Sequence, residues 1–217
     1  MERLDDELSA RRAATAGRHG SGHPLAILLD GDLRRPRLLV AFRPLLVVPH
    51  LCWLALWALL VTPAVVAAWV VALVSGRVPT GLHRFLAAFV RTAAHVSAFL
   101  HLVGRPYPGF LGREGSYPVD LTIAPPARQR RLGVLARLAL VLPALLIESA
   151  YTLLALVVGV LAWCAALVTG RMPAGLRDLG AAALRYQAQT VGYALLLTSR
   201  YPDASPRLET PLPEARP

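Results

Sequence analysis

The stretch Ser75-Gly-Arg-Val-Pro-Thr-Gly-Leu82 returns as Thr169-Gly-Arg-Met-Pro-Ala-Gly-Leu176, and this duplication decides the fold. The two copies are 94 residues apart, and the same offset aligns residues 24–108 with residues 118–202 without a gap. About a third of the aligned positions are identical, which is typical of an internal duplication. The chain therefore consists of two tandem repeats.

The 217 residues divide into these two repeats and two tails. We assign the first repeat to residues 23–110 and the second to residues 111–202. Residues 1–22 are polar and lack the apolar core of a secretory signal, whereas residues 203–217 are rich in proline and acidic residues. We expect both tails to be disordered.

Each repeat contains one long apolar run, at residues 44–74 and 138–168. Hydrophobic residues make up 55% of the chain, too many for a soluble protein of this length. Either run would extend about 45 Å as a helix, against about 30 Å of bilayer hydrocarbon. We therefore predict an all-α membrane protein, with an interfacial turn or kink at Pro49 and Pro143 before a tilted span.

The arginines lie at the ends of these apolar runs. The net charge is +10, and all 23 basic residues are arginine. A nucleic-acid-binding surface would gather such residues on one face with interleaved aromatics, so we expect no nucleic-acid partner. Arginines flanking apolar runs are instead typical of anchoring at the anionic cytoplasmic face of a membrane. The two clusters are Arg34, Arg35, Arg37 and Arg43, and Arg128, Arg130, Arg131 and Arg137.

The duplicated turn ends each long helix. Glycine favours the left-handed cap, arginine meets the negative end of the helix, and proline prevents its continuation. The turn residues that we single out are Gly76, Arg77, Pro79, Gly81, Gly170, Arg171, Pro173 and Gly175.

A second, shorter helix follows each turn, at residues 82–103 and 176–197, and each carries a polar stripe on one face. An arginine facing lipid at mid-depth costs about 2.5–3.5 kcal/mol, so the stripes should face the bundle, water or the interface. They could line a polar path, clamp helices together, or mark amphipathic helices on the membrane surface, and the two structural interpretations are favoured. The stripe residues are Arg84, Arg91 and His95, and Asp178, Arg185 and Gln189.

Each repeat opens with a short extended segment, at residues 24–29 and 117–123, and we expect the two to pair outside the membrane. If both helices of each repeat cross, every extended segment and basic cluster is cytoplasmic, and the Gly-Arg-Xaa-Pro turns face outward. We therefore expect four spans with both termini in the cytoplasm.

No catalytic or metal-binding set is visible. The histidines at positions 50, 83, 95 and 101 lack the spacing of a chelating pair, so we expect no metal, no cofactor and no enzymatic activity. Glu148 is the only acid in either long run and is a candidate intramembrane acid. Pairing of Glu148 with Arg185, with Arg137 or with interfacial water remains open.

Several stretches resemble a bacterial integral-membrane family known as domain of unknown function 4389. They include Tyr117-Pro-Val-Asp-Leu121, Ala166-Leu-Val-Thr-Gly-Arg-Met-Pro-Ala-Gly-Leu176 and Leu195-Leu-Leu-Thr-Ser-Arg-Tyr-Pro202, and the second repeat is the closer match. The resemblance implies a bacterial membrane protein, and we expect it in the cytoplasmic membrane. It implies no activity, substrate or catalytic residue.

The sequence favours a non-enzymatic, multi-pass membrane protein with a structural or accessory role, assembling with other membrane proteins or with itself. The alternative is a small transporter or channel, whose polar path would be lined by the second helix of each repeat.

Overall fold

The computed structural model describes residues 25–27, 37–104, 106–117, 119 and 121–204. The first repeat supplies a strand and two helices, and the second repeats that order. The long helices have 39 residues each and the short ones 21. The elements are β1 (Leu25–Ile27), α2 (Arg37–Ser75), α3 (Thr80–Leu100), β2 (Leu121–Ile123), α4 (Arg131–Thr169) and α5 (Ala174–Ala194).

Both long helices begin earlier than predicted and run through their prolines. Pro49 lies inside α2 and Pro143 inside α4, so the turn expected at these residues is absent. The additional first turns contain good helix formers and bury Val40 in α2 and Val134 in α4. Tertiary packing of these turns therefore outweighs the tendency of proline to break a helix.

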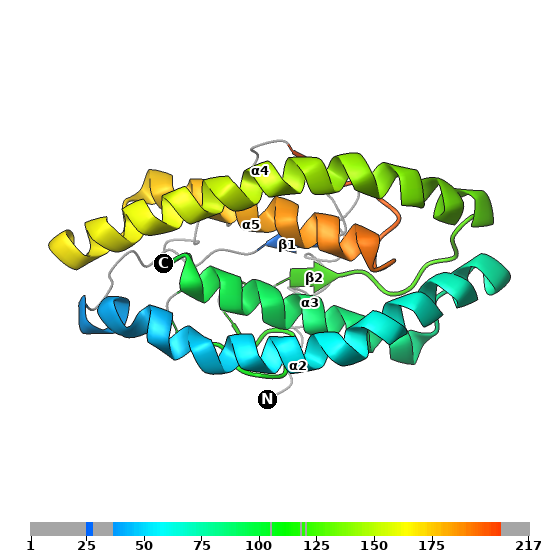
Figure 1. The fold of residues 1–217 in the computed structure, drawn as a ribbon, viewed down its shortest axis with the longest axis horizontal. Coiled ribbons are helices and arrows are strands. Elements are labelled where there is room, and N and C mark those ends of the chain that lie inside the picture. The colour runs from blue at the N-terminus through cyan, green and yellow to red at the C-terminus, as the bar shows by residue number, and fades with distance from the viewer. Residues whose placement is uncertain (1–24, 28–36, 105, 118, 120, 205–217) are drawn as a thin grey trace, which may run out of the picture.

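The two repeats lie antiparallel to each other (Figure 1). The side chain of Arg37, at the start of α2, donates a 2.7 Å hydrogen bond to the Val168 carbonyl at the end of α4. At the other end of the molecule, the backbone amide of Gln129, just before α4, donates a 2.8 Å hydrogen bond to the carbonyl of Gly76, just after α2. An approximate twofold axis perpendicular to the long helices therefore relates the repeats.

This arrangement corrects one part of the predicted topology. Four end-to-end crossings with both basic clusters on one side would require α2 and α4 to run parallel, whereas they run in opposite directions. The physical reason is the connection between the repeats, which folds back along the molecule so that α4 starts beside the end of α2 (Figure 1).

Two equivalent apolar clusters join the repeats. In each, a valine from the start of one long helix and a leucine after the following short helix meet two alanines from the end of the other long helix. Small alanines allow the backbones to approach closely at these contacts. One cluster consists of Val40, Leu102, Ala162, Ala166 and Met172, whereas the equivalent residues Val134, Leu196, Ala68, Ala72 and Val78 are part of a larger core cluster.

Leu102 and Leu196 have left-handed backbones, with φ of 60° and 61°. That conformation costs a leucine about 1–2 kcal/mol. Both side chains are 1% exposed, and burial of a leucine contributes about 1.5–3 kcal/mol. Burial between the repeats thus offsets the backbone cost at both positions.

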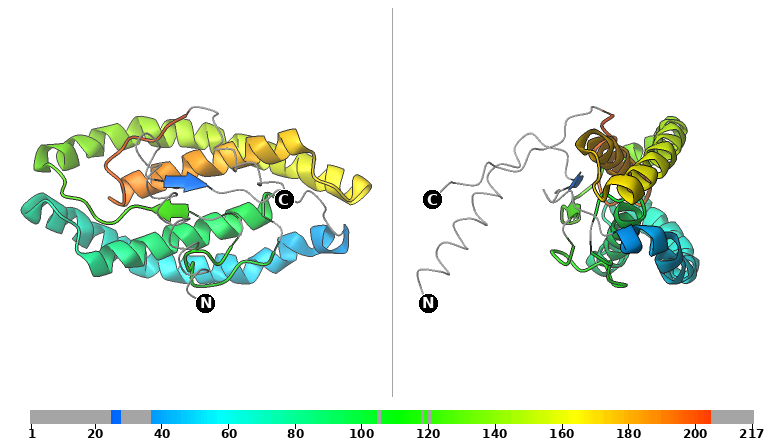
Figure 2. Two further views of the ribbon diagram at one scale, coloured as in Figure 1. Left: turned by 180° about the vertical axis from the view of Figure 1, so that it is seen from behind. Right: turned by 90° about the vertical axis from the view of Figure 1, so that its left-hand side faces the viewer.

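The molecule has three layers (Figure 2). Helices α2 and α4 form one outer layer, and α3 and α5 form the middle layer. The third layer contains the connection after α3 and the short antiparallel ladder of β1 and β2, in which Leu25 lies opposite Ile123 and Ile27 opposite Leu121. The two extended segments therefore pair with each other over the middle layer.

The twofold relation is testable where the repeats differ. A Cβ on Gly159 of α4 would lie 2.9 Å from Cδ2 of His101, whereas the equivalent pair of the other repeat is Val65 and Leu195. We expect Gly159→Val to lower the free energy of unfolding by about 1–3 kcal/mol through overpacking. The double variant with His101→Leu has the same residue types as the Val65 and Leu195 pair, so it should recover most of the lost stability, measured by thermal unfolding in detergent. If the double variant instead loses the sum of the two single losses in unfolding free energy, the two sites are not packed equivalently.

Candidate functional site

The duplicated turns have the same local structure in both repeats. Gly76 and Gly170 have φ of 69° and 70°, the left-handed cap that favours glycine. The Ser75 hydroxyl oxygen accepts a 3.3 Å hydrogen bond from the backbone amide of Arg77, and the Thr169 hydroxyl oxygen accepts a 3.2 Å hydrogen bond from that of Arg171. Pro79 and Pro173 are the N-cap residues of α3 and α5.

The other turn residues face outward. Arg77 and Arg171 are exposed, and the space around Gly81 and Gly175 is open. These four residues therefore contribute no packing that explains their repetition.

The polar stripes do not form one surface. Near the starts of the short helices, Arg84 is exposed, and the Asp178 carboxylate accepts a 2.9 Å bond from its neighbour Arg177. Farther along, Arg91, His95 and Gln189 are buried, and Arg185 is half-buried. The central stripe residues therefore face into the structure.

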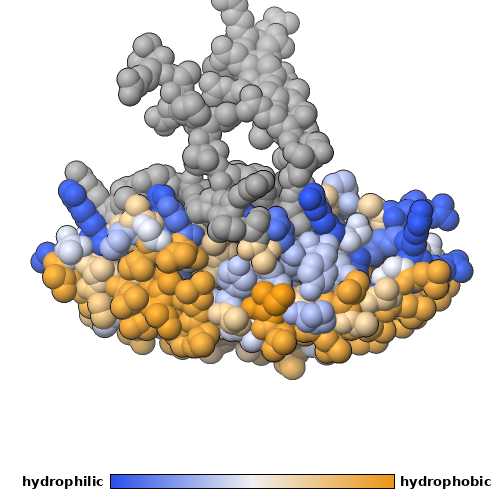
Figure 3. All heavy atoms as spheres, turned by 90° about the horizontal axis from the view of Figure 1, so that it is seen from above, coloured by the Kyte–Doolittle hydropathy of each residue, from blue (hydrophilic) through white to orange (hydrophobic). Residues whose placement is uncertain are grey.

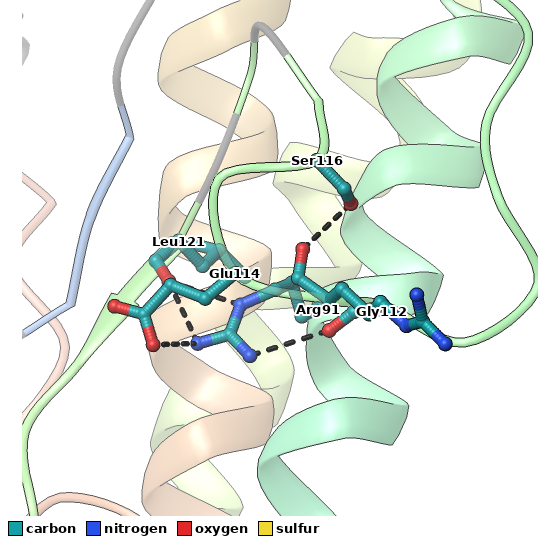
Figure 4. Close-up of polar contacts among 6 residues, drawn as sticks. Arg91, Gly112, Glu114, Ser116 and Leu121 are labelled. Carbon is teal, nitrogen blue, oxygen red and sulfur yellow. Dashed lines mark hydrogen bonds and ion pairs between the residues drawn. The ribbon is translucent and has the colours of Figure 1, made fainter.

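Arg91 binds the connection between the repeats (Figure 4). Its Nε and Nη2 atoms each donate to the Leu121 carbonyl at 3.3 Å, and Nη1 donates to the Gly112 carbonyl at 3.3 Å. The Glu114 carboxylate lies 3.6 Å from Nη2 but is 72% exposed, so it adds little. Arg91 therefore fixes β2 and the connection to the centre of α3, mainly through backbone carbonyls.

His95 and Gln189 occupy equivalent repeat positions, and each contacts the segment of chain that follows its own short helix. The ring of His95 stacks on Tyr117 with centroids 4.8 Å apart, and the Tyr117 hydroxyl donates to the Pro106 carbonyl at 2.9 Å. The Gln189 side-chain oxygen accepts a 2.9 Å bond from the Asp203 amide. These contacts are those of a structural clamp.

Glu148 lies in a short polar chain between α4 and α5. Its carboxylate accepts a 3.0 Å bond from the Thr152 hydroxyl, whose oxygen accepts a 3.1 Å bond from Gln187. Pairing of Glu148 with an arginine stays a prediction.

Two buried arginines are the main features that sequence reasoning missed. Arg43 is 1% exposed and Arg137 is 3% exposed, although both were assigned to anchoring at a membrane surface. Their guanidinium groups instead lie at the C-terminal ends of α3 and α5. The repeat offset relates Arg43 to Arg137, and an arginine recurring directly before both apolar runs was the available signal.

Each arginine contacts the aromatic residue at the same repeat position. Nη1 of Arg43 donates to the Phe99 carbonyl at 2.6 Å, and its guanidinium carbon lies 4.3 Å from the centre of the Phe99 ring. Nη1 of Arg137 donates to the Tyr193 carbonyl at 3.0 Å, and the corresponding ring distance is 4.4 Å. The unpaired carbonyls at a helix end attract a cation, and the ring face adds a cation–π contact.

Gly104 and Gln129 complete the arginine sites. Nη1 of Arg43 also donates to the Gly104 carbonyl at 3.1 Å, whereas Nη2 of Arg137 donates to the Gln129 side chain at 3.1 Å. Arg137 thereby ties the segment before α4 to the end of α5, whereas Arg43 ties the start of α2 to the end of α3 and the residues after it.

His50 and His101 have hydrogen-bond partners in the protein. Nε2 of His50 lies 2.9 Å from the Pro108 carbonyl oxygen, and its ring stacks on Phe110. Burial lowers the pKa of His101, and the hydrogen bond to the Ser97 carbonyl opposes that shift only partly, so the ring is neutral at pH 7. Across the described part of the chain, no three histidine, cysteine, aspartate or glutamate residues are grouped to hold a metal ion.

The family model described as Domain of unknown function (DUF4389) matches the chain twice, at residues 37–111 and at residues 131–204. Each match begins at the first residue of a long helix and contains one helical hairpin with the segment that follows it. No curated protein and no solved structure shows a significant match.

Replacing a buried arginine should open its hairpin. We expect Arg137→Met to lower the free energy of unfolding by about 2–3 kcal/mol, because the Tyr193 carbonyl loses its charged donor. The control is Arg131→Met, an exposed arginine in the first turn of the same helix, which should change stability by less than about 0.5 kcal/mol. Thermal unfolding in detergent measures both, and equal effects would contradict the assigned role.

Replacing Arg91 should release the connection between the repeats. We expect Arg91→Leu to increase trypsin cleavage after the exposed Arg113 by about tenfold, the change produced by about 1.4 kcal/mol of local stability. Glu114→Ala should change cleavage much less, because that carboxylate is 72% exposed. A larger effect of Glu114→Ala would show that the ion pair holds the segment.

Proposed function

The chain belongs to the family of Domain of unknown function (DUF4389), and we propose from its surface that it is an integral membrane protein with a structural or accessory role. Of the described helices, α2 and α4 are long and apolar enough to cross a membrane. Only 17% and 22% of their most apolar stretches are buried, so neither helix resembles the core helix of a soluble protein.

The exposed apolar surface of these two helices is the observation that carries the proposal. Figure 3 shows mostly hydrophobic residues along one convex side of the molecule, with some polar residues near its middle, and hydrophilic residues at both ends and along part of the opposite edge. Such a large continuous apolar surface is typical of a membrane contact. Residues along its whole length contribute, among them Leu38, Leu59, Val74, Leu132, Leu146 and Val168.

The polar residues support a structural role over catalysis or transport. Arg91 binds backbone carbonyls, His95 stacks on Tyr117, and Gln189 binds the Asp203 amide. These interactions hold the chain together and occupy the stripes that a polar path would need. Binding of other membrane proteins or self-association is part of this proposal.

The proposed location is the cytoplasmic membrane of a bacterium, with both termini on the cytoplasmic side. The resemblance of the sequence to a bacterial membrane family and the arginines that flank the apolar runs support this location.

Acidic residues on the apolar surface should detach the protein from membranes. We expect the wild type to stay in the membrane pellet after alkaline carbonate extraction. In contrast, Leu60→Asp with Leu146→Asp should fail to insert stably, because an aspartate in lipid costs up to about 2.5–3.5 kcal/mol. Leu60 and Leu146 are 63% and 74% exposed.

The matched control is Ala127→Asp with Ala204→Asp, at exposed positions outside the helices, which should stay in the pellet. Extraction of the wild type by carbonate would refute the membrane role. A specific solute flux in proteoliposomes, abolished by both Arg91→Ala and Arg185→Ala, would support the transporter alternative instead.

A further inference from the structure

We propose that α2 and α4 lie along the membrane, with their apolar side in a single leaflet, and do not cross it from end to end. This inference rests on the membrane role proposed above and specifies the lipid surface that the protein binds. The partner is one bilayer leaflet with anionic headgroups.

The position of the third layer is the first argument. The ladder of β1 and β2 lies beside the middle of the long helices, not beyond their ends (Figure 1). Near it are the exposed Arg113 and Glu114, and Glu114 contacts Arg91 at the centre of α3. If the long helices stood upright in a bilayer, these charges and the irregular backbone around them would lie at mid-depth, without water to hydrate them.

The extent of the apolar surface is the second argument. Each long helix has 39 residues and measures about 58 Å, nearly twice the roughly 30 Å of hydrocarbon. Large apolar side chains are exposed right up to the ends, where Leu38 and Val74 of α2 are 77% and 69% exposed. An upright helix would place one or both ends in water, whereas a helix lying in the leaflet keeps both ends in contact with lipid.

The placement of charge is the third argument. Exposed arginines flank both long helices, Arg37 and Arg77 at α2 and Arg131 and Arg171 at α4. In Figure 3 strongly hydrophilic residues lie at both ends of the molecule and toward the edge opposite the convex apolar side. Arginines at both ends therefore reach the headgroups of the same leaflet, to which anionic lipids attract them.

This orientation changes where the duplicated turns lie. Four crossings would put Arg77 and Arg171 on the opposite side of the membrane from the connection that contains Arg113. In a single leaflet, both turns and the connection lie on the same side. The three positions therefore separate the possible topologies.

Cysteine labelling tests the orientation in the full-length protein. The native thiols, Cys52 and Cys164, are exposed on α2 and α4 and are first removed as Cys52→Ala with Cys164→Ala. Single cysteines are then introduced as Arg77→Cys, Arg113→Cys or Arg171→Cys, all at exposed positions. A membrane-impermeant maleimide is applied to inside-out and to right-side-out vesicles after a carbonate wash.

We expect all three variants to be labelled in inside-out vesicles and protected in right-side-out vesicles. Labelling of Arg77→Cys and Arg171→Cys from the side opposite to Arg113→Cys would mean four crossings. Labelling of Arg77→Cys and Arg171→Cys from opposite sides of the membrane would mean that the antiparallel helices α2 and α4 cross it. Either pattern overturns the proposal while leaving the membrane role intact, whereas loss of the protein in the carbonate wash refutes the membrane role itself.

A second pair of variants keeps the test valid if an arginine substitution impairs folding. Thr80→Cys and Ala174→Cys occupy equivalent exposed positions beside the same turns and leave every arginine in place. They should give the same labelling pattern as Arg77→Cys and Arg171→Cys, and labelling from the side opposite to Arg113→Cys would overturn the proposal.

Discussion

The buried guanidinium groups of Arg43 and Arg137 are the constraint on which the rest of the structure depends. A charge that is almost fully removed from water needs acceptors for its donors, and the carbonyls at the ends of α3 and α5 accept hydrogen bonds from the Nη1 atoms of these arginines. Because the arginines belong to α2 and α4, each contact fixes the open end of one helical hairpin. The left-handed leucine that follows each hairpin is thereby held against the other repeat.

Other buried polar side chains of α3 and α5 bind chain segments on the side of these helices that faces away from α2 and α4. Arg91 binds the connection between the repeats, and Gln189 binds the segment that follows α5. The face of α3 and α5 that points away from the long helices is thus covered by the protein's own chain. No described segment covers the outer side of α2 and α4, and this asymmetry between the two faces underlies the proposed membrane role.

Much of this architecture follows from the sequence, because duplication and apolar length are properties of single segments. The glycine turns and the long and short helices of each repeat could be predicted, whereas the roles of Arg43 and Arg137 could not. An arginine near the end of an apolar run has the same sequence pattern whether it contacts a lipid headgroup or donates to carbonyls at a buried helix end. The offset of 94 residues likewise shows which positions correspond, but not which rotation relates them, so the antiparallel arrangement required the structure.

The equivalent clusters around Leu102 and Leu196 have a consequence for chains that carry one copy of this unit. Each repeat carries a valine and a leucine that contact the other repeat, and also two alanines that are contacted by the valine and leucine of the other repeat. Such a surface is self-complementary, the property that defines an isologous interface. A single hairpin with these residues would close the same contact with an identical molecule, so the tandem protein corresponds to a homodimer whose two subunits have been fused.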